Sequence, residues 1–205
     1  MFYGLERLID LALSEDIATG DITTEALIAP EARGRADIVA KAPMIVAGIG
    51  VARQVFQRLD GDLQIAAVAS EGQSASPGDT LMQIDGRMAS LLTAERTALN
   101  FLQRLSGIAT HVRRYVEDLQ NRSVRLVDTR KTTPGWRSLE KYAVRIGGAF
   151  NHRLNLSDGI LIKDNHIAAC GGITEAISRA RRRAPHSLKI EVEAESLSVA
   201  EADFS

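Results

Sequence analysis

The chain has 205 residues, 45% hydrophobic and 25% charged, which is typical of a globular enzyme. Its formal net charge of −1 argues against a general role in binding nucleic acid or a membrane surface, because such proteins usually carry a basic excess. A single cysteine, Cys170, excludes an intramolecular disulfide, and no apolar run is long enough to span a bilayer. We therefore expect a cytoplasmic protein with neither a nucleic-acid nor a membrane partner.

The first part of the sequence predicts helices that alternate with short strands. Apolar residues at helical spacing predict an amphipathic helix over about 5–14. Residues 34–50 are rich in β-branched residues with Gly and Pro breaks, which predicts two strands. A second helix is expected over 50–59, and the shorter period of 63–86 predicts further strands. This pattern indicates a small sheet accompanied by helices.

Residues 90–120 form the longest predicted helix, because their apolar residues recur at gaps of four and three and lie on one stripe. Gly107 is expected to divide this segment into two helices, since glycine costs about 1 kcal/mol inside a helix. Arg96 and Asn100 lie nearly opposite the stripe. A solvated helix face explains their position most simply, although a polar face packed against a partner would show the same pattern.

In the second part of the chain, short apolar runs lie next to clusters of polar, mostly cationic residues. The run Val124–Val127 is followed by DTRKTTPG, and NHR precedes the run Gly159–Ile162, which is followed by KDNH. Catalytic groups of α/β barrels lie at the carboxyl ends of parallel strands, so an apolar run that ends in charge is typical of a strand reaching a site. Neighbouring cations are costly without an anion, and we therefore expect a pocket for a substrate with several negative charges.

The remaining elements complete a pattern of strands and helices. Ser138 is expected to cap a helix over 139–146 that ends at Gly147-Gly148. Another helix is predicted over 174–184. Residues 188–194 then alternate apolar and charged side chains, which predicts a strand whose glutamates could contact a ligand inside a barrel.

The motifs of the chain are, in order, EDIATGDITTEAL, ERTALNFLQRLSGIAT, DTRKTTPG, LEKYAVRIGG, NHR, LIKDNHI and KIEVEAESL. In this order and spacing they closely resemble the quinolinate phosphoribosyltransferase family, the decarboxylating nicotinate-nucleotide pyrophosphorylases. The resemblance covers nearly the whole chain. It implies an α/β protein with an N-terminal α+β open-faced sandwich domain over residues 1–105, followed by the first part of a TIM-like barrel of parallel strands over residues 106–205. Because the family's barrel continues with further strands, we expect an incomplete barrel with little activity of its own.

The resemblance also implies a reaction. It is phosphoribosyl transfer from phosphoribosyl pyrophosphate to quinolinate with decarboxylation, which gives nicotinate mononucleotide, pyrophosphate and CO2 in de novo NAD biosynthesis. Mg2+ would accompany the donor and neutralise the pyrophosphate, with its protein ligands expected beyond Ser205. Arginine suits planar recognition of the two quinolinate carboxylates, and lysine supplies a compact charge.

Carried over residue by residue, the family's pattern implies a set of substrate-binding side chains. They are Arg96, Thr129, Arg130, Lys131, His152, Arg153, Lys163 and Glu193. Lys131, directed to the donor, and Glu193, near the ribose, would be the catalytic residues, and Glu191 is the less favoured choice on spacing. Arg96 would reach the pocket from the neighbouring subunit of a homodimer.

Two alternatives remain open. The chain could be a related phosphoribosyltransferase that acts on nicotinate or is the molybdenum-associated homologue, although the double cation set and the TTPG turn favour quinolinate. Alternatively, the sequence EGQSASPGDTLMQIDG resembles half of a biotinyl or lipoyl carrier domain. Such a module needs a lysine at the tip of a turn, and no lysine lies between Lys41 and Lys131.

Overall fold

The computed structural model describes residues 4–119 and 123–194, which belong to two compact units, Met1–His152 and Arg153–Ser205. The first unit contains α1 (Leu5–Ile17), α2 (Ile22–Leu27), β1 (Arg33–Val39), β2 (Met44–Ile45), α3 (Ile49–Leu59), β3 (Gln64–Ala67), β4 (Ser74–Ala75), β5 (Thr80–Arg87), α4 (Met88–Asp118) and α5 (Arg137–Gly147). The second contains β6 (Ile160–Ile162), α6 (Asp164–Cys170), α7 (Ile173–Arg183) and β7 (Ile190–Val192). Across the described ranges, no helix combines the length and apolar character needed to cross a membrane.

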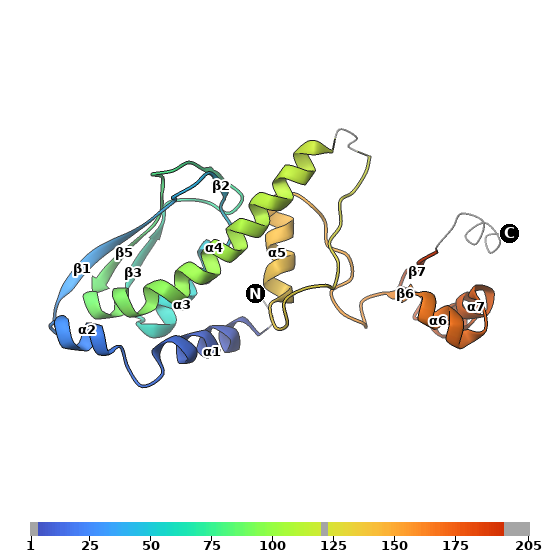
Figure 1. Cartoon of the computed structure of the whole chain (residues 1–205), viewed down its shortest axis with the longest axis horizontal. Helices are drawn as coiled ribbons and strands as arrows, with labels where there is room; N and C mark the ends of the chain where they lie inside the picture. Colours follow the sequence, from blue (N-terminus) through green and yellow to red (C-terminus); the bar gives the residue numbers. More distant parts are fainter. Residues whose placement is uncertain (1–3, 120–122, 195–205) are drawn as a thin grey trace. The chain divides into compact units, whose positions relative to one another are not determined.

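The N-terminal sheet is antiparallel, with strand order β1-β5-β3, and a separate pair joins β2 to β4. β5 pairs on both sides, so its backbone is hydrogen-bonded within the sheet and its residues Met82 and Ile84 are fully buried. Figure 1 shows α3 and α4 lying over one side of this sheet. The helices and strands predicted from residues 5–14, 34–50, 50–59 and 63–86 are therefore confirmed.

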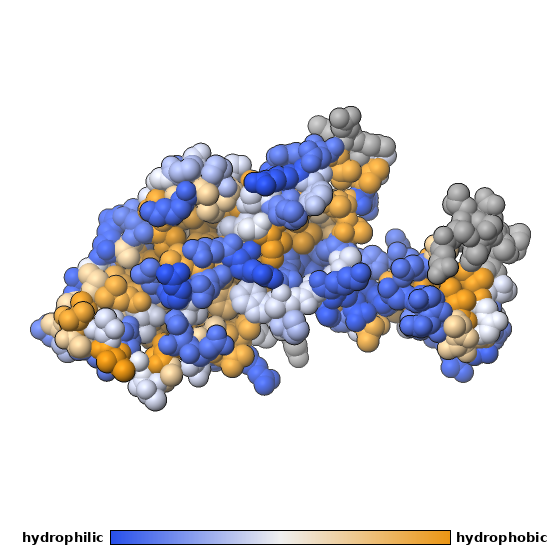
Figure 2. All heavy atoms as spheres, viewed as in Figure 1, coloured by the Kyte–Doolittle hydropathy of each residue, from blue (hydrophilic) through white to orange (hydrophobic). Residues whose placement is uncertain are grey.

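α1 packs against α3 and α4, and α2 packs against α4. The buried residues of α1, Leu5, Ile9 and Leu13, recur at gaps of four and form one face of the helix. The side chain of Asp21 caps α2 by accepting the backbone N–H of Thr24 at 3.0 Å. Figure 2 shows apolar side chains at the surface around α2, where Ile22 is 77% exposed.

α4 is a single helix of 31 residues, so the prediction that Gly107 divides it is wrong. Leu105 and Ala109, on either side of the glycine, are fully buried against the core. Burying a leucine contributes about 1.5–3 kcal/mol, which exceeds the cost of roughly 1 kcal/mol for a helical glycine. Tertiary packing therefore overrides the local preference.

α5 packs along α4 at close range (Figure 1). A Cβ atom added to Gly147 would lie 2.7 Å from the Ala109 carbonyl oxygen and 2.7 Å from the Val112 Cβ atom, so only glycine fits there. The helix ends as predicted, because Gly148 has φ 103° and donates its N–H to the Arg145 carbonyl.

The predicted cap of α5 is wrong. Ser138 lies inside the helix, and Trp136 is the N-cap residue. The Trp136 ring stacks on Phe101 of α4, with centroids 4.8 Å apart and planes 19° from parallel, and the Trp136 backbone N–H donates to the Thr133 carbonyl at 3.0 Å. This anchored turn begins the helix two residues earlier than the serine would.

The second part of the chain contains the predicted parallel pairings. The run Val124–Val127 contributes one parallel bridge, from Val127 to Phe150, instead of a full strand. In the second unit, β6 pairs with β7 in parallel, with Ile160 opposite Ile190. These pairings and the antiparallel N-terminal sheet confirm the predicted α/β class, and no closed sheet occurs in the ranges described.

The domain boundary expected at residues 105 and 106 falls inside α4, and the division stays a prediction. The further helix expected after Ala194 lies outside the described residues.

Two glycine substitutions test the packing of α4 against α5. Gly147→Ala should lower the free energy of unfolding by about 1–3 kcal/mol, because the added methyl group overlaps α4. Gly107→Ala is the matched control. No heavy atom lies within 4 Å of its added Cβ, and alanine is the better helix former by up to about 1 kcal/mol, so this variant should be as stable as the wild type or more stable. Urea denaturation measures both, and a Gly147→Ala protein of wild-type stability would contradict the close contact.

Candidate active site

A buried network organises the segment that carries the first cation cluster. The Asp128 carboxylate forms an ion pair with the Lys141 ammonium group of α5, and the two side chains are 8% and 4% exposed. The same carboxylate accepts the Asn151 side-chain amide at 2.7 Å and the His152 backbone N–H at 2.8 Å. Lys141 also donates to the His152 carbonyl at 3.1 Å. The chain before Thr129 is thereby fixed to the chain around His152.

A second network holds the TTPG turn, residues 132–135, against α4. Arg104 of α4 donates to the Glu140 carboxylate at 2.7 Å and to the Thr133 hydroxyl at 2.9 Å. The Thr133 backbone N–H and hydroxyl both donate to Glu140, at 3.2 Å and 2.8 Å. Burial opposes ionisation of Glu140, but the hydrogen bonds from Arg104 and Thr133 outweigh it and lower the pKa of this carboxyl group.

Between these two networks lie three predicted substrate-binding residues. The Thr129 hydroxyl accepts the Lys131 backbone N–H at 3.1 Å, and Lys131 itself is exposed. Arg130 is partly buried, and its Nε atom is enclosed without any hydrogen-bond partner. A buried donor without a partner costs free energy, so such groups are usually paired.

The second unit has the same feature at Arg153. Its Nη1 atom donates to the Gly159 carbonyl at 2.8 Å, while its Nε atom is buried and lacks a partner. Among the buried side-chain polar atoms in the described ranges, these two arginine Nε atoms are the unpaired ones. Both belong to the motifs predicted to bind anions.

Lys163 and Glu193 lie at the carboxyl ends of neighbouring parallel strands. Lys163 follows β6, Glu193 follows β7, and their side chains form an ion pair of 3.0 Å. The Glu193 backbone N–H donates to the Ile162 carbonyl at 2.9 Å, which fixes the register there. The structure therefore brings these two predicted residues together at the carboxyl ends of β6 and β7.

Other predicted residues have different surroundings. Arg96 is exposed on α4, as the spacing indicated, and its role at a subunit interface stays a prediction. His166, in the same polar cluster as Lys163, accepts the Lys163 backbone N–H at 3.0 Å through Nδ1 at the start of α6. That imidazole therefore caps the N-terminus of α6. In the described part of the chain no three His, Cys, Asp or Glu side chains gather as a metal site, so no magnesium site is assigned to these residues.

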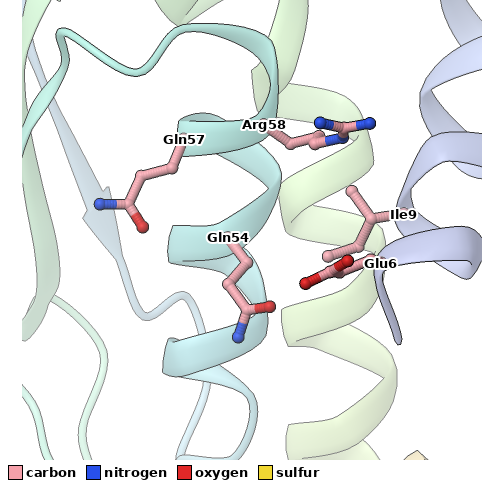
Figure 3. Close-up of a pocket in the computed structure, with 5 residues that line it drawn as sticks. All are labelled: Glu6, Ile9, Gln54, Gln57 and Arg58. Atoms are coloured by element: carbon pink, nitrogen blue, oxygen red, sulfur yellow. The ribbon is translucent and has the colours of Figure 1, made fainter. Parts of the chain in front are cut away.

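A pocket of about 290 Å3 lies between α1 and α3, and Figure 3 shows its lining residues Glu6, Ile9, Gln54, Gln57 and Arg58. Arg58 is already paired with Asp10, at 2.5 Å and 3.1 Å, and this hydrogen bond lowers the pKa of Asp10. None of the predicted substrate-binding residues lines the pocket, so we assign no function to it.

Comparison with protein families matches residues 21–106 to the N-terminal domain and residues 108–204 to the C-terminal domain of quinolinate phosphoribosyl transferase. The crystal structure of NadC from Streptococcus pyogenes is 43% identical, with a TM-score of 0.94 over 98% of this chain and 71% of that one. The chain belongs to the quinolinate phosphoribosyltransferase family. The nicotinate-nucleotide pyrophosphorylase of Francisella tularensis is a further structural relative, 40% identical with a TM-score of 0.92 over 97% of this chain and 70% of that one.

Curated members of the family are similar in sequence but longer. The probable nicotinate-nucleotide pyrophosphorylase [carboxylating] of Bacillus subtilis is 47% identical over 93% of this chain and 66% of its own length. A protein of the same name from Synechocystis is 48% identical over 90% of this chain and 62% of its own length. The chain thus spans slightly less than two thirds of these relatives.

Sequence reasoning missed the residues that hold the site in place. Asp128 and Asn151 stood within the quoted motifs, but their pairing crosses 23 residues of sequence. Lys141 lies opposite the apolar stripe of α5, where helical periodicity assigns it to solvent, yet the residue is 3% exposed. A lysine on the polar side of a helix carries no local signal that a second segment will cover it.

Replacing Glu140 by glutamine tests the network at the TTPG turn. The lowered pKa of Glu140 means that its stabilising contribution is complete above the pKa of the unfolded side chain, about 4.3, and is lost as the pH falls through the folded value. The difference in unfolding free energy between the wild type and Glu140→Gln should therefore be largest near neutral pH and shrink below about pH 4. Urea midpoints across this range measure it.

Glu175→Gln serves as the control, because Glu175 forms an exposed i,i+4 pair with Arg179. It should change stability little at any pH. A difference for Glu140→Gln that stayed constant with pH would show that the Glu140 charge contributes nothing.

Proposed function

We propose that the protein transfers a phosphoribosyl group from phosphoribosyl pyrophosphate to quinolinate and releases CO2, which yields nicotinate mononucleotide for NAD synthesis. The observation that carries this proposal is that each unit has a cation-rich motif with a buried, unpaired arginine Nε atom, at Arg130 in the first unit and at Arg153 in the second. An unpaired guanidinium N–H in a cation-rich motif suits a carboxylate oxygen, because a hydrogen bond between two charged groups is stronger than one between neutral groups. Family membership supports the same substrate.

The residues divide into roles that fit this chemistry. Arg130, Arg153 and Lys163 would bind the two quinolinate carboxylates, with Thr129 and His152 adding hydrogen bonds. The pyridine nitrogen attacks the anomeric carbon as pyrophosphate leaves, and the ring then loses its 2-carboxylate as CO2 and takes up a proton from water at that carbon. Fixed cations favour the second step, because electron density builds up on the ring carbon when the carboxylate leaves.

The donor half of the reaction falls to Lys131 and Glu193. The exposed ammonium group of Lys131 suits the pyrophosphate, and the Glu193 carboxylate suits a ribose that gains positive charge in the transition state. Glu193 is paired with Lys163 in the free protein, at 3.0 Å, so substrate carboxylates would have to replace Glu193 as the partner of Lys163. Magnesium enters the proposal only as the counter-ion of the donor, and no step is assigned to it.

The alternatives are less well supported. A monocarboxylate such as nicotinate would pair with fewer of these cations and would gain fewer charge-assisted hydrogen bonds. A carrier module is disfavoured because residues 71–86 include most of β5, the central strand of the N-terminal sheet. We also propose a cytoplasmic homodimer in which Arg96 completes the neighbouring site.

Isothermal calorimetry with quinolinate and with nicotinate tests the substrate. Quinolinate should bind more tightly, because it alone offers a second carboxylate to the cations. Arg153→Ala should weaken quinolinate binding by roughly 1.5–3 kcal/mol, the value of a hydrogen bond to a charged group. Arg182→Ala is the control, since Arg182 is exposed at the end of α7 and should leave the affinity unchanged. Equal affinities for the two acids would count against quinolinate as the substrate.

Mixing Arg96→Ala and Arg130→Ala chains tests the shared site. Each variant alone should bind quinolinate weakly, whereas a mixed dimer has one site with both arginines. After subunit exchange about a quarter of all sites should recover wild-type affinity, as expected for random pairing in a symmetric dimer. If mixed dimers form and no tight sites return, Arg96 does not act across the interface.

A further inference from the structure

The Asp128 and Lys141 pair is buried more deeply than any predicted substrate-binding residue. Lys141 is 3% exposed as a residue, whereas Arg130 and His152 are partly buried and Lys131 is exposed. A lysine on the polar side of a helix usually extends into solvent. Its burial therefore calls for an explanation.

Both members of the pair form several hydrogen bonds within the protein. The Asp128 carboxylate accepts from Lys141, from the Asn151 amide and from the His152 backbone, and Lys141 additionally donates to the His152 carbonyl. Additional hydrogen bonds of this kind are the condition under which a buried ion pair is tolerated. Because the Lys141 and Asp128 side chains are only 4% and 8% exposed, neither group is accessible to a substrate.

The location of the pair gives it a second consequence. Asp128 immediately precedes Thr129, Arg130 and Lys131, and its backbone N–H donates to the Phe150 carbonyl at 3.1 Å. In one segment the pair therefore lies directly before the substrate-binding residues that start at Thr129. In the other it contacts the backbone of His152. At the other end of the loop formed by residues 129–133, Glu140 accepts hydrogen bonds from Thr133 and from Arg104.

We propose that Asp128 and Lys141 form a positioning pair that orients Arg130, Lys131 and His152 for anion binding without contacting the substrate. This proposal rests on the proposed function for the identity of the anion. The chain from Thr129 to Thr132 is short and is held by hydrogen bonds on both sides. A shift of the Asp128 backbone would therefore be passed along the chain to Arg130. A contribution to stability alone would not require the pair to adjoin both binding segments.

Two variants separate positioning from stability. Asp128→Asn/Lys141→Met removes both charges and leaves no unpaired ion in the core. Asn151→Ala removes the hydrogen bonds that an exposed residue donates to the Asp128 carboxylate and to the Lys141 carbonyl, so it provides a folded variant if the double variant fails to fold. The control is Asp60→Asn, since Asp60 is another buried carboxylate, 5% exposed, and accepts from Arg87 at 2.9 Å and Ser90 at 2.7 Å.

The first measurement is amide hydrogen exchange of the free protein. Exchange at Lys131, Thr132 and Thr133, none of which contacts Asp128 directly, should rise by about tenfold or more in the double variant and rise measurably in Asn151→Ala, with α3 unchanged. Asp60→Asn should leave these three amides unaffected. A uniform rise over the whole unit, or no rise at residues 131–133, would overturn the proposal.

The second measurement is the quinolinate Kd of the folded variants. It should rise by about tenfold or more in the double variant, because small misplacements of binding groups are costly, and stay at the wild-type value in Asp60→Asn. Wild-type affinity in a folded double variant would overturn the positioning role. If the wild-type chain itself does not bind quinolinate, the proposed function fails, and hydrogen exchange still decides whether the pair orders the loop.

Discussion

The close packing of α4 against α5 is the constraint on which the first unit depends. The buried residues of α4 pack in the core with α3 and the N-terminal sheet. α5 packs against α4 at Gly147. Arg113 of α4 donates to the Gly147 carbonyl at 3.0 Å, so a hydrogen bond adds to the steric fit. Because one rigid helix contacts all these layers, the position of α5 is defined relative to the sheet.

The position of the cation-bearing loop follows from that of α5. Trp136 stacks on Phe101, and Glu140 links Thr133 to Arg104, so the TTPG turn is held against α4 by an apolar and a charged contact. Further along the same helix, Lys141 holds Asp128. Successive side chains of α5 thus fix the two ends of one short loop, which suits the proposed role of this segment in presenting charged groups to a ligand.

Local sequence pattern was enough to predict most elements, because each has its own period and its own turn residues. The helix α3, the strand β6 and the glycine end of α5 are examples, and the motif resemblance supplied the fold class. The errors share a different cause. Gly107 and Ser138 were judged by helix and cap preference, whereas the packing of Leu105 and the stacking of Trp136 decided the outcome. Such contacts join residues far apart in the chain and leave no periodic signal.

The residues of the candidate site could be predicted from the sequence, but their contacts could not. A cation in a motif is visible in the sequence, but its partner is not. Lys141 and Lys163 both have carboxylate partners, the first buried with Asp128 and the second exposed with Glu193. These two pairings differ in consequence, since the buried ion pair is costly to break and the exposed one contributes little.

A distinction between fixed and available charge follows from these pairings. The Lys141 ammonium group is committed to the protein and gives rigidity. The Lys163 ammonium group can exchange an exposed partner for a ligand at small cost. The Arg130 and Arg153 Nε–H groups have no partner to lose, so a carboxylate that reaches them adds a hydrogen bond without breaking one within the protein. If the proposed function holds, the arginines should therefore contribute more to the free energy of anion binding than the lysine at the strand end, which must give up its Glu193 partner first.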